Sequence, residues 1–266
     1  MSVRLTKMHG LGNDYLFLDD RDGTCVAPEA LAREVSDRHR AVGSDGLILV
    51  LAAEGSADVR MRMFNADGSE AEMCGNGLRC FAKYVVDRGL ATSQPLAIET
   101  GAGVLLAAWT RGSDGLVSDV EVEMGVPTMA CEAIPAVLPG VDPRSHVISH
   151  PIDRAAFGVP DSIEPTISLV SMGNPHIIMY GNDLPSLDLA AVGSHIERLA
   201  AFPKRINLHV VDVHTSTHVS MRTWERGSGI TQACGTGACA VVVAGVLGLR
   251  HDRSVRVSLP GGDLAV

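Results

Sequence analysis

The chain is poor in basic residues. Its 266 residues include 22 lysines and arginines against 31 aspartates and glutamates, which gives a formal net charge of −9. Non-specific binding to nucleic acid or to anionic membranes requires a positive surface, and the composition argues against one. We therefore expect neither a nucleic acid nor a membrane as a partner.

Long apolar segments are also missing. The longest run, Ala238 to Leu249, is too short to span a bilayer. The first 19 residues are interrupted by Lys7, His9 and Asp14, and they show no apolar core followed by a small-residue cleavage site. These features predict a cytosolic protein.

The cysteines lack the spacing of a metal site or of a redox pair. None of the six forms a Cys-x-x-Cys motif, and no histidine pair lies close to them in the sequence. In the cytosol we expect all of them to be reduced. We predict no bound metal. The six are Cys25, Cys74, Cys80, Cys131, Cys234 and Cys239.

Two of these cysteines stand in a repeated motif. Cys74-Gly75-Asn76-Gly77 recurs as Cys234-Gly235-Thr236-Gly237, and an apolar run without proline follows each copy. Turn-forming residues precede both copies, so each cysteine is predicted at or just before the first turn of a helix. The unpaired N–H groups and the dipole at a helix start favour a thiolate and bind anions. The alternative is that both are ordinary buried cysteines, which the duplication disfavours.

Other polar residues keep nearly the same separation. Cys234 follows Cys74 by 160 residues (234 − 74), Glu225 follows Asn65 by 160 (225 − 65) and Asn174 follows Asn13 by 161 (174 − 13). A constant offset predicts two similar halves, residues 1–117 and 118–266, with a site where the halves meet. Coincidence is the alternative, because asparagine is common in turns.

The apolar pattern predicts a helix among strands in each half. The helices from Cys74 to about Arg88 and from Cys234 to about Leu249 are apolar on nearly every face, as an enclosed helix is. Two outer helices are expected at 28–38 and 187–199, and the region 127–165 shows no clear pattern. Strands are expected at 3–8, 15–18, 47–51, 59–64, 96–100, 103–110, 117–124, 167–170, 177–180, 206–212 and 218–223, with a final hairpin of 255–259 and 263–266.

With these motifs in hand, the chain resembles the diaminopimelate epimerase family of amino acid racemases that work without pyridoxal phosphate. The resemblance covers nearly the whole length. It implies an α+β fold of two pseudo-symmetric domains, each a β-barrel-like sheet wrapped around a central α-helix. The motifs that carry it lie at residues 7–14, 64–69, 74–77, 173–176, 224–227 and 233–237.

The resemblance also implies an activity, the epimerisation of LL-2,6-diaminopimelate to the meso form in lysine and peptidoglycan precursor biosynthesis. It implies a homodimer and no cofactor, with Cys74 and Cys234 as the two catalytic acid/base residues. His176 and Glu225 would modulate the thiol pKa values. The substrate-binding residues would be Asn13, Asn65, Gly75, Asn76, Asn174, Asn207, Glu225, Arg226, Gly235 and Thr236, with Arg226 suited to a distal carboxylate.

Several alternatives stay open at this point. Glu225 and Arg226 could be a solvated surface pair, or Glu225 could bind a substrate ammonium. Many relatives carry an acidic residue where this chain has Ile230. A proline or hydroxyproline racemase would share the fold, and a redox or metal-binding protein would use the cysteines differently.

Overall fold

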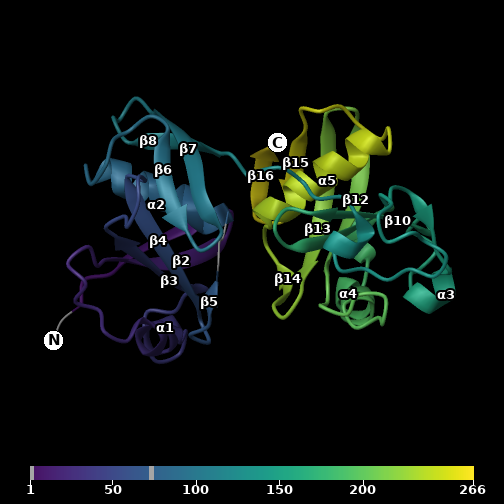
Figure 1. Ribbon diagram of the computed structural model, residues 1–266, viewed down its shortest axis with the longest axis horizontal. Coiled ribbons are helices and arrows are strands. Elements are labelled where there is room, and N and C mark those ends of the chain that lie inside the picture. Colours follow the sequence, from purple (N-terminus) through teal and green to yellow (C-terminus); the bar gives the residue numbers. More distant parts are fainter. Residues whose placement is uncertain (1–2, 72–74) are drawn as a thin grey trace. The chain divides into compact units, whose positions relative to one another are not determined.

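The computed structural model describes residues 3–71 and 75–266 and divides into two compact units, Met1–Met124 and Gly125–Val266. Each unit consists of one sheet with helices packed on it (Figure 1), and in the described residues each sheet has eight strands. The architecture is the α+β fold expected from the sequence. Among the described residues, no helix has both the length and the apolar character that crossing a bilayer requires.

The sheet of the first unit has the strand order β1-β2-β3-β4-β6-β7-β8, and β5 pairs with β4. Two neighbouring pairs, β2 with β3 and β4 with β6, are parallel and therefore need crossover connections, which contain the helices α1 (Pro28–Ser36) and α2 (Gly75–Asp87). The strands are β1 Thr6–Gly10, β2 Asn13–Asp19, β3 Gly46–Leu51, β4 Val59–Asn65, β5 Glu70–Ala71, β6 Leu96–Thr100, β7 Gly103–Arg111 and β8 Val117–Val122.

The helices α1 and α2 cover opposite faces of this sheet. Phe81 of α2 packs in one apolar cluster with Ile48, whereas Ala32 of α1 packs in another with Leu47. Because Leu47 and Ile48 are neighbours on β3, their side chains point to opposite faces. This explains why β3 is a continuous apolar run rather than an alternating one.

The second sheet has the order β16-β15-β13-β12-β11-β10-β9, and β14 pairs with β13. Its parallel pairs are β11 with β12 and β13 with β15, and the crossovers contain α4 (Leu189–Ile196) and α5 (Gly235–Leu247). The remaining elements are β9 His150–Pro151, α3 Arg154–Phe157, β10 Thr166–Ser171, β11 Pro175–Tyr180, β12 Asn207–Thr215, β13 His218–Glu225, β14 Gly229–Thr231, β15 Arg256–Leu259 and β16 Gly262–Ala265, with short 3₁₀ turns η1 Cys131–Ala133 and η2 Leu184–Ser186.

The two units repeat one topology. The elements β1 to β7 with α1 and α2 correspond in order, pairing and direction to β10 to β16 with α4 and α5. The parallel pair Tyr15 and Gly46 has its counterpart in His176 and Asn207, and both helices that follow a cysteine motif have 13 residues. The duplication expected from the constant sequence offset is confirmed.

The structure corrects several element boundaries. The helix expected at 187–199 spans only Leu189–Ile196, because the Asp188 carboxylate caps its start by accepting a hydrogen bond from Ala191 N. The short strands β5 and β14 were not predicted, since two or three residues leave no periodic pattern. The region 127–165 contains β9, α3 and η1, which the sequence pattern did not indicate.

Candidate active site

Cys234 occupies the N-cap position of α5, at the position predicted from its motif. It is 5% exposed, and its Sγ lies 3.5 Å from Thr236 Oγ1 in the first turn of the helix. In the described part of the chain the Cys234 side chain makes no capping bond to α5. The first N–H groups of the helix, those of Gly235 and Thr236 among them, are therefore suited to an anion.

The Glu225 carboxyl group lies beside that sulfur. Glu225 ends β13, and the turn into β14 brings back Thr231, whose hydroxyl donates to Glu225 Oε1 over 2.7 Å. Burial raises the pKa of Glu225, and the Thr231 hydroxyl and the Cys234 thiol beside the carboxyl group offset part of this effect. A carboxylate with a raised pKa is a better proton acceptor for a thiol than a fully solvated one.

Two histidines form a buried chain on the neighbouring strands. His176 Nε2 lies 2.8 Å from Asn174 Oδ1, and His176 Nδ1 lies 2.8 Å from His209 Nε2. The other nitrogen of His209 lies 3.0 Å from Thr223 Oγ1. Both imidazoles are fully buried, which lowers the pKa of His209 to about 3 and holds the pKa of His176 well below 6.5, where His209 and Arg226 add to the effect. Both rings are therefore neutral at pH 7.

Asn207 connects this chain to Arg226. Its Oδ1 accepts a hydrogen bond from Arg226 N over 2.9 Å, and its Nδ2 lies 3.4 Å from His176 Nδ1. The Arg226 side chain is exposed and donates from Nη1 to Lys204 O over 3.0 Å. A guanidinium has five N–H donors, so other donors of Arg226 can serve a carboxylate.

Glu197 holds the turn that carries Arg226. This carboxylate is 5% exposed and accepts hydrogen bonds from Trp224 Nε1 at 2.8 Å, Gly227 N at 3.2 Å and Arg205 Nη1 at 3.1 Å. Burial would raise the pKa of Glu197, but these donors outweigh it and lower the pKa. Through the bonds of Trp224 and Gly227, the first and last residues of the Trp-Glu-Arg-Gly motif are fixed to Glu197 at the end of α4.

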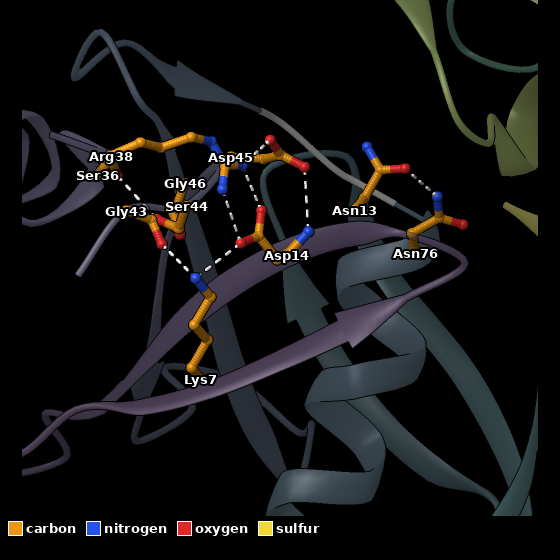
Figure 2. A network of polar contacts seen from close by, with 10 residues as sticks. All are labelled: Lys7, Asn13, Asp14, Ser36, Arg38, Gly43, Ser44, Asp45, Gly46 and Asn76. Carbon is orange, nitrogen blue, oxygen red and sulfur yellow. Dashed lines mark hydrogen bonds and ion pairs between the residues drawn. The ribbon is translucent and has the colours of Figure 1, made fainter.

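In the first unit, Cys74 lies outside the described residues, and α2 begins at the next residue, Gly75. Asn76 is 3% exposed and donates from Nδ2 to Asn13 Oδ1 over 3.3 Å (Figure 2). Arg79 Nη2 donates to Asn76 Oδ1 over 2.6 Å. The structure therefore brings Asn13 and Asn76 together.

A network of charged side chains anchors the start of β2 beside Asn13 (Figure 2). Asp14 accepts from Arg38 Nη1 at 3.1 Å, Lys7 Nζ lies 2.9 Å from Asp14, and Asp45 Oδ2 accepts from Asp14 N at 3.0 Å. Burial alone would raise the pKa of Asp14, but the hydrogen bonds and charges of Arg38 and Lys7 outweigh it and lower the pKa to about 2. The turn that presents Asn13 is held by this network.

Asn65 has a local role in the structure. It ends β4, and its Nδ2 donates to Ser69 Oγ over 3.0 Å across the turn to β5. Its counterpart Glu225 accepts a hydrogen bond from Thr231 in β14, the strand that corresponds to β5. Asn65 and Glu225 thus stand at matching positions with different chemistry, an amide in the first unit and a carboxyl group in the second.

Three residues of the second unit were not singled out from the sequence, namely Glu197, His209 and Thr223. His209 lies between Leu208 and Val210 in β12, and Thr223 follows the buried Val219 and Met221 at alternate positions of β13. A polar side chain at a position that the alternation assigns to the core was the available signal. Glu197 left no such signal, because it follows the end of α4.

Among residues 3–71 and 75–266, no group of three or more histidine, cysteine, aspartate or glutamate side chains is placed to hold a metal ion. The hydrogen-bonded partners of the described site residues include amides, hydroxyls, imidazoles, backbone groups and the Arg79 guanidinium. Such a set is suited to an organic substrate with carboxylate groups.

Comparisons with known proteins point to one family. The family described as diaminopimelate epimerase matches residues 5–130 and 168–266. A protein named diaminopimelate epimerase from Acetivibrio thermocellus is 44% identical over 265 residues, which cover 99% of this chain and 90% of that protein. One of the same name from Methanothermobacter thermautotrophicus is 42% identical over 267 residues, with 99% and 90% covered.

Solved structures at low identity share the fold. A probable proline racemase from Agrobacterium radiobacter superposes with a TM-score of 0.68 at 16% identity, over 98% of this chain and 83% of that chain. A PhzF-family protein from Bacillus anthracis superposes with a TM-score of 0.67 at 18% identity, over 100% and 90%. With the family match and relatives of 44% identity over nearly the full length, the chain belongs to the diaminopimelate epimerase family.

Proposed function

We propose that the chain epimerises LL-2,6-diaminopimelate to meso-diaminopimelate by an acid/base mechanism that uses Cys74 and Cys234 and no cofactor. The observation that carries this proposal is the buried Cys234 thiol at the start of α5, close enough to the Glu225 carboxyl group to lower its pKa. The relatives named above bear the name of this activity.

The reaction moves one proton off the α-carbon and another onto it. One cysteine, as thiolate, takes the α-proton, and the other, as thiol, delivers a proton to the opposite face of the carbanion. In the reverse direction the two sulfurs exchange roles. Glu225 supports the Cys234 half of this cycle, because it can accept the thiol proton and return it.

The developing charge is the energetic problem of this reaction. When the α-proton leaves, negative charge builds up on the adjacent carboxylate, so donors that are already oriented stabilise the transition state more than the substrate. The first N–H groups of α5 and α2, at Gly235 and Thr236 and at Gly75 and Asn76, are the proposed donors. The helix dipoles add to the same effect.

The remaining polar residues are proposed as substrate contacts. Asn13, Asn65, Asn174 and Asn207 would bind amino and carboxylate groups. Arg226 would hold the distal carboxylate and so select one stereocentre of a two-headed amino acid. We further propose a cytosolic homodimer that serves lysine and peptidoglycan precursor biosynthesis.

Deuterium exchange tests the proposal directly. The reduced protein is incubated with LL-diaminopimelate in D₂O without added cofactor, and deuterium at the α-carbons is followed by NMR. We expect exchange at one α-carbon only, with formation of the meso isomer. Absence of exchange with this substrate, under conditions in which the protein remains folded, would rule the proposed activity out.

Matched cysteine variants separate catalysis from folding. Cys74→Ala and Cys234→Ala should each abolish epimerisation, whereas Cys25→Ala, at a half-buried cysteine outside both motifs, should retain it. Equal activity in Cys234→Ala and Cys25→Ala would contradict the two-thiol mechanism. Proline and hydroxyproline are offered in parallel, and exchange with them alone would favour the racemase alternative.

A further inference from the structure

Glu197 contacts the two segments that hold the Arg226 side chain. Its Oε1 atom accepts a hydrogen bond over 3.2 Å from Gly227 N, at the residue that follows Arg226. The same oxygen accepts from Arg205 Nη1 over 3.1 Å, and Arg205 follows Lys204, whose carbonyl oxygen accepts from Arg226 Nη1 over 3.0 Å. Glu197 thus joins the backbone that carries Arg226 to the loop that holds its guanidinium.

The other oxygen of this carboxylate is fixed as well. Glu197 Oε2 accepts a hydrogen bond from Trp224 Nε1 over 2.8 Å. The indole is packed against Gly193 of α4, where an added Cβ atom would overlap the ring. Glu197 is 5% exposed, so its carboxylate has little room for another orientation. Both segments are therefore tied to one fixed group at the end of α4.

The backbone of Arg205 supports this connection. Its φ angle is 58°, in the left-handed region that is unfavourable for a residue with a Cβ atom. Such a conformation persists only where surrounding contacts hold it. Here Arg205 N donates to Phe202 O over 2.8 Å, and the Arg205 guanidinium bonds Glu197. The turn is thus held at the residue directly after the carbonyl group that accepts from Arg226.

The first unit shows that the fold does not require this arrangement. Glu197 is the C-cap residue of α4, and Asp37, 160 positions earlier (197 − 37), is the C-cap residue of α1. Asp37 accepts from two backbone N–H groups of its own turn. Phe64, at the same offset from Trp224 (224 − 64), is fully buried. Because burying a carboxylate costs free energy unless donors compensate it, the arrangement in the second unit points to a role beyond folding.

We propose that Glu197 is a positioning residue that sets the distance of the Arg226 guanidinium from Cys234, and thereby the chain length of the dicarboxylic amino acid that binds. This inference rests on the proposed function, in which Arg226 binds the distal carboxylate. A guanidinium anchored both at its backbone and at Nη1 has lost the freedom to follow carboxylates at other distances. An amino acid one methylene shorter would leave part of its charge unpaired.

The binding of two dicarboxylic amino acids tests the inference without turnover. L-2-aminopimelate has the chain length of diaminopimelate, and L-2-aminoadipate is one methylene shorter. Isothermal titration calorimetry gives the ratio of their dissociation constants for the wild type and for Glu197→Gln. We expect the wild type to prefer 2-aminopimelate. In Glu197→Gln the preference should fall about tenfold, because the amide nitrogen would face a donor that the carboxylate accepts.

Two further variants separate positioning from folding. Arg205→Gln keeps the Glu197 carboxylate and removes its exposed partner, so the preference should fall about two- to fivefold. Glu132→Gln, at an exposed position of the same unit, should leave the preference unchanged. A merely structural role of Glu197 would weaken the binding of both amino acids equally and would not change their ratio. Thermal unfolding shows which variants are folded, and Arg205→Gln decides if Glu197→Gln is not.

The outcomes for this inference and for the proposed function are distinguishable. A wild type that prefers 2-aminopimelate but does not epimerise diaminopimelate would refute the activity, and the preference in the variants would still decide the role of Glu197. A wild type that binds neither amino acid, or binds both equally, would overturn the inference. A wild-type preference in the folded Glu197→Gln, or in Arg205→Gln where it decides, would overturn it as well.

Discussion

Asn76 Nδ2 donates a hydrogen bond to Asn13 Oδ1 over 3.3 Å, so the first turn of α2 and the start of β2 are joined by two amides. Arg79, one turn further along α2, donates to Asn76 Oδ1 over 2.6 Å and to Gly75 O over 3.4 Å. The oxygen of Asn76 is therefore taken up by the guanidinium, and the Asn13 amide is left with Nδ2 donors for a ligand. The Asn13 amide of the first unit and the Asn174 amide of the second unit are thus both oriented by protein contacts. The partner of Asn13 is Asn76, and the partner of Asn174 is His176.

Replacing Arg79 should weaken substrate binding more than folding. In Arg79→Lys the planar pair of donors is lost, and we expect KM to rise by about five- to tenfold, as for one hydrogen bond of about 1 kcal/mol. Steady-state kinetics on diaminopimelate measure this change. Arg88→Lys, just beyond the end of the same helix, is the control, since Arg88 bonds Thr6 Oγ1 far from the motif. Equal KM values in the two variants would remove the positioning role of Arg79.

Glu225→Gln should separate activity from stability. The folded pKa of Glu225 is raised above 4.5 by burial, so the folded state holds this proton more tightly than the unfolded state. As the pH rises above 4.5, ionisation of Glu225 therefore lowers the free energy of unfolding. Glutamine does not ionise and avoids this loss. We expect Glu225→Gln to be at least as resistant to urea as the wild type at pH 7.5, with the relative gain disappearing below pH 4.5. Its epimerase activity should fall by about 100-fold, because an amide cannot take the thiol proton.

The control for this experiment is Glu132→Gln, at an exposed position of the same unit. It should change neither the urea midpoint nor the rate. A loss of stability in Glu225→Gln at pH 7.5 would mean that the partners of the charged carboxylate stabilise it more than burial destabilises it.

Asp14→Asn should have the opposite pH dependence. The folded pKa of Asp14 is about 2 against an ordinary value of 3.8, so its stabilisation is complete above pH 3.8 and is lost as pH falls toward 2. Arg38 is half-exposed and solvent screens the pair, so we expect Asp14→Asn to lower the free energy of unfolding by about 1 kcal/mol at pH 7. Urea titrations between pH 7 and pH 3 measure the difference, which should shrink at the acidic end. A difference that is constant over this range would exclude the ion pairs as its cause.

Gly193→Ala should destabilise the second unit. Gly193 lies in α4 against the Trp224 indole, and a Cβ atom would overlap the ring. Because Trp224 is held by its bond to Glu197, the ring cannot move away without breaking it. We expect a loss of about 1–3 kcal/mol in the free energy of unfolding, as for overpacked cores. Gly55→Ala, with no atom within 4 Å of the added Cβ, should be close to neutral, and a similar loss there would point to backbone effects.

Strands were predicted well where apolar and polar residues alternate, as in β6 and β4, and where they form one apolar run, as in β3. β6 was predicted at its observed bounds, and β3 and β4 were predicted within one residue at each end. The outer helix at α4 was predicted too long, since its ends depend on the Asp188 cap and on the turn at Glu197. The strands β5 and β14 were missed, because their pairing with β4 and β13 is a tertiary contact.

The sequence by itself determined the local chemistry of this protein. A cysteine followed by Gly-x-Gly places a sulfur at a helix start, and a repeated offset of about 160 residues identifies two copies of one topology. Both depend on backbone hydrogen bonding and on spacing along the chain. Only the tertiary structure decided which buried polar groups meet. His176, His209 and Thr223 come together because the register of β11, β12 and β13 puts them on the same face of the sheet, and that register is set by strand pairs distant in sequence.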